Sequence, residues 1–526
     1  MAVGHCSRLD DAQCQELHAA TLRLLAHTGL IVDEPEALDL LRKAGAAVDG
    51  NLVRISNDLV HWALRVAPKE VTLYGRDGQP ALRCGGYEYS FGAGSDCMNC
   101  FDHRTGERRR AVLADVVEAA RVQDACENLD FVMSLFTPSD VTPEVMDRHQ
   151  MAAMLANTTK PIVYVTLNDV TAHLDVTAMA EAVVGGPEAL AERPLVACYK
   201  NTLFPLVHNA EAVRTLLDLA GRGLPCIYSP VSTAGTVAPM TVLGSTVVMN
   251  AGVLAGLVTA QLKREGAPYI AIGWAGEALD MRTMVDVFSG PDHRAVYSSL
   301  LHWYGLPMWT LGGVTDAKLP DQQAAAEAAL TLLADAVSGG HMIHDIGFME
   351  SAYTGSLTQL LLCDDIAGWV KAFLKPIEIT DEELGLEAIE EVGPGELFLK
   401  HKHTRRHARD RWQPQVFDRR SREDWLSGGA GGPASAGVEG GLHAKAVAAA
   451  RVEQILAGPG APPLPPEVEA VIGAVLERAE RRVRPARRPA SPAIDPPQGS
   501  SGSPSSPIAQ NGLWAISQAW PSGSAK

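Results

Sequence analysis

Short apolar segments, many of them rich in β-branched residues, recur along the middle of the chain. Each is followed by a stretch in which apolar residues stand at helical spacing, and successive segments begin about 31 to 43 residues apart. A buried strand followed by a helix produces this pattern, and eight such units predict an α/β fold with a (β/α)8 barrel, the TIM barrel. The predicted strands begin at Asp130, Pro161, Pro194, Pro225, Pro268, Pro307, His341 and, weakest of the eight, Pro376.

An open, doubly wound sheet is the alternative arrangement for alternating strands and helices. Such a sheet often carries a Gly-x-Gly-x-x-Gly turn after a strand, and none of the predicted strands is followed by one. The count of eight units also favours the barrel. Five of the first seven predicted strands begin with proline, which suits the first residue of a strand.

Helical patterns flank the predicted barrel on both sides. Residues 1–112 are predicted to form an N-terminal cap of helices and short strands, in which two amphipathic helices each end at a glycine. The barrel is predicted over 113–380 and a C-terminal helical extension over 381–482. Residues 483–526 are rich in Pro, Ser and Gly. They are predicted to be a disordered tail, because they cannot bury enough apolar surface to order themselves.

The bulk composition narrows the class of protein. The chain has 526 residues and a formal net charge of -17, which argues against a general nucleic-acid-binding protein. Two basic runs, 401–412 and 478–488, are predicted to be solvated helix faces. The N-terminus has no apolar signal core, and we find no uncharged apolar run as long as a membrane span, so we expect a cytoplasmic protein without membrane contact. The cysteine pair Cys97 and Cys100 lacks the second pair that a four-cysteine zinc site needs.

The stretch SGGHMIHDIGFME, Ser338–Glu350, places three ionisable side chains where the seventh predicted strand ends. In a barrel the chemistry lies at the C-terminal ends of the strands, so His344 and Asp345 are predicted to face the barrel mouth, with Glu350 and Tyr353 on the loop that follows. Other predicted strand ends supply Asn168, Tyr199, Lys200, Asn201, Tyr228, Ser229, Ser232, Trp274, Glu277, Thr315 and Asp316.

These strand-end residues are rich in aromatic, amide and carboxylate groups and poor in metal ligands. His341 and His344 are a candidate metal-binding pair, but residues three apart in a strand point to opposite faces, so we expect no metal. Aromatic rings and a carboxylate suit a quaternary ammonium group, because ring faces attract the cation and a fully methylated nitrogen has no N–H to satisfy. The alternatives are a structural, hydrogen-bonded role for His344 and a core role for the aromatic residues.

Several stretches of the chain resemble one known family. They are LHAATLRLLAHTGLIVDEPEALDLLRKAGAAVDGNLVRI near the N-terminus, VTLYGRDG, the run from FGAGSD through DHRTGERRR, PVSTAGTVAPMTVLGSTVVMNAG in the fourth unit, and TRRHARDRWQPQVFDRRSREDW after the barrel. Together, over roughly residues 15 to 480, they resemble the trimethylamine methyltransferase (MttB-like) family. The resemblance implies a (β/α)8 barrel that transfers a methyl group from an amine to the cobalt of a separate corrinoid protein.

The family's archaeal trimethylamine enzymes carry pyrrolysine in the barrel, whereas this sequence has only standard residues. We expect the equivalent position in HDIGFME, near Ile346. The lack of pyrrolysine puts trimethylamine in doubt as the substrate. In this respect the sequence is similar to the non-pyrrolysine branch of the family, which resembles glycine betaine methyltransferases. The chemistry agrees, because a quaternary ammonium releases a neutral tertiary amine and needs no acid, base or metal from the protein. The protein has only to hold one methyl carbon in line with its acceptor and to keep water out.

On this reading the substrate is glycine betaine or a related betaine. His344 and Asn201 are the candidate donors to its carboxylate, and Glu277 or Glu350 could face the ammonium. The predicted catalytic residues are His344 and Glu350; the predicted substrate-binding residues are Asn201, Tyr199, Tyr228, Trp274, Glu277, Asp345 and Tyr353.

The corrinoid (cobalamin) is expected on a partner, because the Asp-x-His-x-x-Gly signature in which a histidine ligates cobalt is absent from the sequence. We therefore expect a cognate corrinoid protein as partner, no tightly bound cofactor and a homo-oligomer. Two other functions stay open. One is a quaternary-amine-binding protein without catalysis, and the other is a metal-dependent barrel hydrolase or lyase that uses His341, His344 and Asp345.

Overall fold

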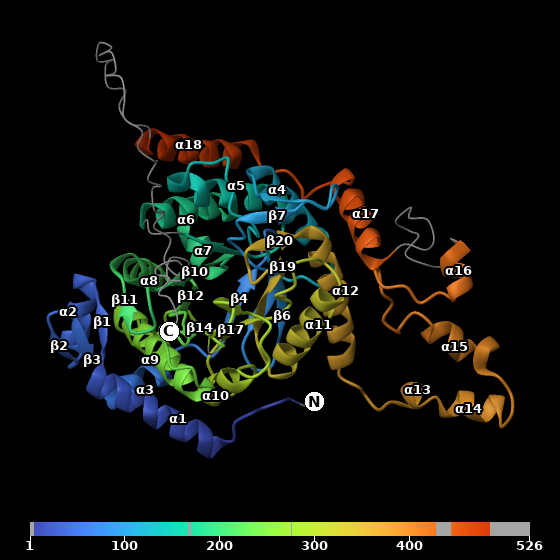
Figure 1. Cartoon of the computed structure of the whole chain (residues 1–526), viewed down its shortest axis with the longest axis horizontal. Helices are drawn as coiled ribbons and strands as arrows, with labels where there is room; N and C mark the ends of the chain where they lie inside the picture. Colours follow the sequence, from blue (N-terminus) through green and yellow to red (C-terminus); the bar gives the residue numbers. More distant parts are fainter. Residues whose placement is uncertain (1–4, 167–169, 275, 428–442, 484–526) are drawn as a thin grey trace, which may run out of the picture.

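The computed structural model describes residues 5–166, 170–274, 276–427 and 443–483. Its centre is a curled sheet of seven parallel strands surrounded by helices (Figure 1). Most of these strand residues are buried, which is why the strands read as short continuous apolar runs rather than as alternating patterns. In sheet order the strands are β6 (Ser90–Ala93), β18 (Met342–Ile346), β17 (Met308–Leu311), β14 (Tyr269–Ile272), β12 (Cys226–Ser229), β10 (Val196–Asn201) and β9 (Ile162–Val165).

The two edge strands of this sheet are joined through one short segment. Phe131 forms a parallel bridge with Gly92 of β6, and Val132 forms one with Ile162 of β9. The pairing therefore runs around a ring of eight parallel segments. Each segment is followed by a helix, in chain order α4 (Leu113–Ala125), α5 (Met146–Asn157), α6 (Val170–Val184), α8 (Ala210–Arg222), α9 (Val242–Lys263), α10 (Val296–Tyr304), α11 (Gln322–Val337) and α12 (Leu357–Leu374).

The strand predicted at Pro376 is wrong. Residues 375–380 carry no strand pairing, and Ile377 and Ile379 are 87% and 83% exposed. An Ile-x-Ile alternation is also compatible with an exposed extended linker, so the pattern alone could not decide. The missing member of the ring is β6, which we expected among the short strands of the cap; Gly92 and Ala93 weaken its apolar signal. β6 lies inside 1–112, and the domain boundaries stay predictions.

The N-terminal part packs against one side of the ring (Figure 1). Its helices are α1 (Asp11–Arg23), α2 (Pro35–Lys43) and α3 (Asn57–Val66), and its small sheet pairs β1 (Leu30–Val32) with β11 (Val207–His208). All three helices contact α9. By length and composition α9 could cross a membrane, contrary to our expectation that no such run exists, but 72% of its most apolar window is buried inside this protein. A core helix passes the same test.

The described residues after α12 form further helices. α13 (Asp381–Leu384), α14 (Leu386–Val392), α15 (Lys402–His407) and α16 (Arg422–Ser427) lie on an arm that projects from the body (Figure 1). α17 (Ala444–Ala457) returns to pack on α12 and α4, and α18 (Pro466–Val483) packs on α6. The predicted disordered tail lies outside the described residues, apart from Val483.

Candidate active site

Two carboxylates stand at the C-terminal ends of neighbouring strands, both on unusual backbone. Asp345 is in β18 and has φ 78°, and Asp96 follows β6 and has φ 71°. The pairing of β18 with β6 shifts register between Ile343 and Ile346, which marks a bulge beside Asp345. Left-handed φ values cost free energy for residues other than glycine, and such strained residues cluster at functional sites. Bulges are also common next to active sites, where they change the direction of a side chain.

A third carboxylate, Glu277, comes from a small sheet after two other strands. This sheet pairs β13 (Thr233–Ala234), which follows β12, with β15 (Glu277–Asp280) and β16 (Val285–Val287), which follow β14. Glu277 is buried, and the indole Nε1 of Trp274 donates to its Oε1 at 3.1 Å. The parallel arrangement therefore brings three acids from different loops to one end of the ring.

These three carboxylates lie close enough to influence one another. Burial, with a smaller contribution from the charge of Asp286, raises the pKa of Glu277 to about 7, although the Trp274 indole acts in the opposite direction. Burial also raises the pKa of Asp345, with contributions from the charges of Glu277 and Asp96. Asp96 keeps accessible surface, yet desolvation is the largest cause of its raised pKa.

His344 is a neutral, fully bonded histidine. Its Nδ1 lies 2.6 Å from the carbonyl oxygen of Thr310, and Trp309 Nε1 donates to its Nε2 at 3.2 Å. The carbonyl can only accept and the indole can only donate, so Nδ1 carries the proton. Burial lowers the pKa of His344 to about 3, so its ring is neutral and its 3.3 Å contact with Asp345 is not an ion pair. This geometry leaves no donor for a substrate carboxylate, which is the role we expected for His344.

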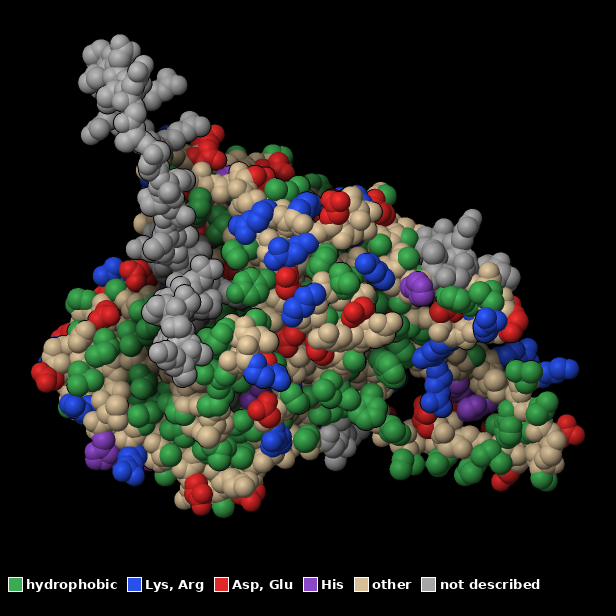
Figure 2. Space-filling view, viewed as in Figure 1, with side chains coloured by type: hydrophobic (Ala, Val, Ile, Leu, Met, Phe, Trp, Pro, Cys, Tyr) green, Lys and Arg blue, Asp and Glu red, His purple; other side chains and the backbone are tan. Residues whose placement is uncertain are grey.

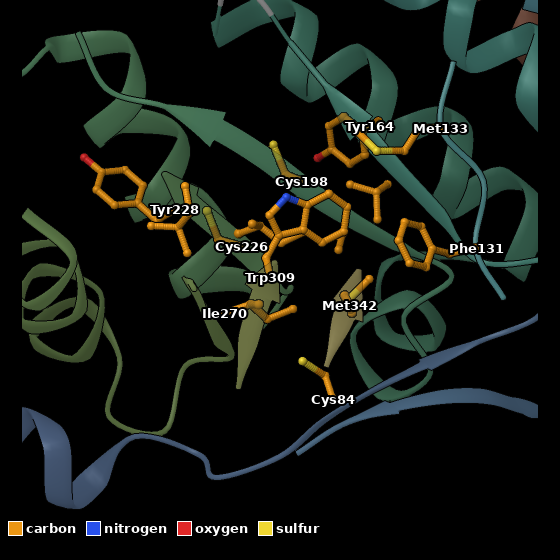
Figure 3. Packing of buried hydrophobic residues seen from close by; sticks show 14 of the residues in the cluster. Cys84, Phe131, Met133, Tyr164, Cys198, Cys226, Tyr228, Ile270, Trp309 and Met342 are labelled. Atoms are coloured by element: carbon orange, nitrogen blue, oxygen red, sulfur yellow. The ribbon is translucent and has the colours of Figure 1, made fainter. Parts of the chain in front are cut away.

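Aromatic rings form the wall around His344. Trp309 is fully buried at the centre of the ring of strands (Figure 3). Its ring centroid lies 4.2 Å from that of His344, 5.8 Å from that of Tyr199 and 5.3 Å from that of Phe131. The centroid of the Trp274 ring lies 5.4 Å from that of His344. The two buried acids Glu277 and Asp345 thus share one region with three large aromatic residues, Trp274, Trp309 and Tyr199.

The structure brings together only part of the predicted site. Tyr199, Trp274, Glu277, His344 and Asp345 are linked through these ring contacts, hydrogen bonds and charge interactions. Asn201 follows Tyr199 on the same face of β10, because side chains alternate along a strand, and its buried Oδ1 has no hydrogen-bond partner among the described residues. Asn168 lies outside the described residues.

Tyr228 lies elsewhere, whereas Glu350 and Tyr353 lie on the loop that follows β18 and have other neighbours. The Tyr228 ring packs against α9, close to Gly256, and its hydroxyl contacts His208 Nδ1 at 3.3 Å. It alternates with Ser229, whose hydroxyl reaches Tyr199, so Tyr228 points away from the ring interior. Glu350 is paired with Arg108 at 2.7 Å, and the pKa of Tyr353 is raised by burial and by Asp286 and Glu350.

Among the described residues, no group of three side chains at the mouth is placed to hold a metal ion. His341 precedes β18, bonded to the Gly86 carbonyl at 2.9 Å and to the Met308 amide at 3.1 Å, at the opposite end of the strand from His344. Among the described residues, the one group of three side chains suitably placed for a metal is Glu382, His403 and His407, in the C-terminal arm.

Two residues of this region escaped the sequence reasoning. Trp309 sits inside a predicted strand and looked like ordinary core. Asp96 ends the run SFGAGSD, which we assigned to the cap. Had β6 been recognised as a strand, the rule that chemistry lies at strand ends would have pointed to Asp96.

The raised pKa of Glu277 predicts that cation affinity depends on pH. Below about pH 7 a proton occupies Glu277, and a bound cation must displace it. Affinity for tetramethylammonium should therefore rise with pH, by at most about tenfold per pH unit for one displaced proton, and level off above pH 7. Calorimetric titrations between pH 5.5 and 8.5, on wild type and Glu277→Gln, test this. A variant with the same pH dependence as wild type would show that another group is responsible.

Comparison with known proteins gives one consistent family. The family model described as trimethylamine methyltransferase (MTTB) matches residues 2–483. The trimethylamine methyltransferase MttB of Desulfitobacterium hafniense is 31% identical over 425 residues, covering 80% of this chain and 85% of that protein. A glycine betaine methyltransferase of Desulfitobacterium hafniense is 28% identical over 481 residues, covering 90% and 97%. The Methanosarcina barkeri monomethylamine methyltransferase structure aligns with a TM-score of 0.46 at 10% identity, covering 91% and 89%.

Proposed function

Because the chain belongs to the trimethylamine methyltransferase family, we propose that it is a corrinoid-dependent methyltransferase that demethylates a quaternary ammonium compound. The ring of eight parallel segments, each followed by a helix, supports a (β/α)8 barrel with its active site at the end where Asp96, Glu277 and Asp345 meet. The observation that carries the proposal is this group of desolvated carboxylates beside aromatic rings. Such a site attracts an organic cation and offers few donors to anything else.

The charges at the site favour a cation without a carboxylate of its own. Three Lys or Arg side chains are buried among the described residues: Arg148, Lys200 and Arg294. Arg148 is paired with Asp147 and Asp175, and Lys200 donates to the Thr166 carbonyl at 2.9 Å. Tetramethylammonium or choline therefore matches the site better than glycine betaine, whose carboxylate would join three acids that already repel one another.

Arg294 is the buried cation closest to these acids, since its charge lowers the pKa of Glu277 and Asp345. Its Nη1 donates to Asp335 Oδ2 at 2.5 Å and to the Leu311 carbonyl, and its Nη2 donates to the Phe288 carbonyl at 2.7 Å. Its positive charge is thus already balanced by Asp335. The Nε–H of Arg294 has no partner among the described residues, and this donor favours a betaine as the second candidate substrate.

The protein's own part in the reaction is to bind, orient and exclude water. The carboxylates fix the ammonium, and the Trp309 and Trp274 rings limit the positions that its methyl groups can take. Neutral His344 cannot act as a proton donor near neutral pH, and none is needed, because the leaving tertiary amine is neutral. The corrinoid, as the methyl acceptor on a partner protein, supplies the nucleophile.

Four exposed apolar side chains lie on the segments around Glu277, and we call them the apolar rim. Met240, Leu243, Met281 and Met284 are all exposed and lie on the segments that follow β12 and β14. Methionine-rich exposed surfaces adapt to partner proteins, and loops at this end of a barrel must lie close to any methyl acceptor. We propose that this rim contacts the corrinoid protein.

A methyl-transfer assay tests the proposed function. The purified protein is mixed with chemically reduced cobalamin, or with a reduced corrinoid partner, and with tetramethylammonium, choline, trimethylamine or glycine betaine. Methylation of the corrinoid, followed by its absorbance, should occur with tetramethylammonium or choline and not with trimethylamine. Transfer from glycine betaine alone would support the second candidate, and the Arg294→Lys variant should then lose it. No transfer from any amine, with the corrinoid partner present, would contradict the proposed function.

A further inference from the structure

The second cluster of chemically competent side chains lies far from the barrel mouth, on the C-terminal arm. Glu382 in α13 and His403 and His407 in α15 each offer one ligand atom, and these atoms all lie within 4.8 Å of one another. His403 and His407 are four residues apart and share one face of α15, with ring centroids 4.4 Å apart. Figure 2 shows histidine, basic and acidic side chains gathered on this arm.

The hydrogen bonds around His407 already orient it as a metal ligand. Its Nδ1 lies 2.5 Å from Asp410 Oδ2, and its Nε2 lies 2.8 Å from Glu382 Oε1. Metal-binding histidines usually donate one ring N–H to a carboxylate and bind the metal through the other ring nitrogen. In His407, Nδ1–H would donate to Asp410, and a metal would replace the proton on Nε2. The Nε2 of His403 lies 3.1 Å from the backbone carbonyl oxygen of Glu382, so both histidines are held beside this residue, His403 at its backbone and His407 at its carboxylate.

A glycine at the end of α13, Gly385, lets the chain pass close to His403. Gly385 ends α13 with φ 60°, and a Cβ placed there would lie 3.5 Å from His403 Nε2. Left-handed backbone at this position turns the chain at the end of α13, three residues after Glu382. The turn therefore holds α13 against the His403 end of α15.

The arm also lacks the apolar core that would otherwise hold it. No residue of α13 or α15 is buried, and Leu384, Leu386 and Ile389 are about half exposed. Small units that cannot bury enough apolar surface are commonly stabilised by a metal or a disulfide. An ion cross-linking α13 to α15 would close the 380–410 segment at its two ends.

We propose that Glu382, His403 and His407 bind one divalent transition-metal ion, with Zn²⁺ as the best match to two imidazoles and one carboxylate. Asp410 is a positioning residue for His407. Arg406 also pairs with Glu382, at 2.5 Å; when the metal binds, its side chain moves away or pairs with the carboxylate oxygen that the metal does not use. The site departs from our sequence-based expectation that the chain holds no metal, because the histidines were assigned to a solvated basic face. It is independent of the methyl-transfer reaction.

Zinc binding to the full, untagged chain tests the proposal. After chelator treatment and its removal, Zn²⁺ is titrated in competition with a chromogenic chelator, and Co²⁺ absorbance reports the ligand set. Wild type should bind one Zn²⁺ per chain at this site. The His403→Gln and His407→Gln variants should each bind it at least tenfold more weakly, and Asp410→Asn about 10–100-fold more weakly.

The matched control is His149→Gln, since His149 also pairs with a carboxylate, that of Glu480 at 3.3 Å, but belongs to α5 rather than to the arm. It should bind Zn²⁺ as wild type does. Hydrogen exchange gives a second readout: Zn²⁺ should protect amides of 380–410 in wild type and leave those of His407→Gln unchanged. An absence of Zn²⁺ binding in wild type, or binding and protection that persist in both ligand variants, would overturn the proposal.

Discussion

Replacing Asp345 by Asn should weaken binding of tetramethylammonium by about 30-fold or more, which is the loss expected when one partner of a desolvated charge pair is removed. Asp345 is buried beside Glu277 and Asp96, so no water replaces its charge. In methyl transfer most of the loss should appear in KM. The ammonium carries its full charge in the bound complex and less charge as the methyl group departs, so kcat should change little.

The Asp345→Asn protein should fold normally, because asparagine tolerates the left-handed backbone at φ 78° and is close to aspartate in shape. Asp280→Asn is the matched control. Asp280 belongs to the same small sheet as Glu277, but it pairs with Arg282 at the surface, and its loss should leave affinity within about twofold, as for other exposed pairs. Equal affinity of wild type and Asp345→Asn would show that the cation does not bind at these carboxylates.

Truncation of Trp309 to Ala should lower the free energy of unfolding by about 3–5 kcal/mol, the usual range for a fully buried tryptophan. The indole fills the centre of the ring of strands and donates the hydrogen bond to His344 Nε2. Trp309→Phe keeps most of the apolar volume and removes the N–H donor together with part of the ring. It should therefore cost less, about 1–3 kcal/mol, from the acceptor left unsatisfied.

Urea unfolding followed by far-UV circular dichroism measures both Trp309 variants. Trp369→Ala serves as control, because Trp369 is largely exposed and stacks only at the surface on Trp412, with centroids 6.0 Å apart. If Trp309→Ala lowered the free energy of unfolding no more than Trp369→Ala does, the packing of the Trp309 ring would not be important for stability. A large loss for Trp309→Phe, equal to that for Ala, would instead show that the hydrogen bond to His344 dominates.

The strand–helix repeat predicted seven of the eight segments in the ring, because fully buried parallel strands leave short apolar runs that stand out from amphipathic helices. It failed at both ends of the pattern. Ser90–Ala93 has too few large apolar residues to be noticed, and the Ile377–Ile379 alternation satisfies the strand template without any partner strand. Pairing is a tertiary property, and no local pattern contains it.

The site was predicted in part for a similar reason. The rule that chemistry lies at strand ends pointed to Tyr199, Glu277 and Asp345. It could not say which side of a strand faces inward, so Tyr228 was included although its ring packs against α9. Nor could a sequence show that both ring nitrogens of His344 are occupied, since their partners are Thr310 and Trp309 on another strand.

The most direct test of the cationic site compares two ligands of the same shape. Choline and 3,3-dimethylbutan-1-ol differ in that a quaternary carbon replaces the charged nitrogen, so calorimetric titration of both isolates the contribution of charge. If desolvated carboxylates and aromatic rings hold an ammonium group, choline should bind at least about 30-fold more tightly, a difference of about 2 kcal/mol. Equal binding of the neutral alcohol would contradict the account, because the site would then recognise shape and apolar surface rather than positive charge.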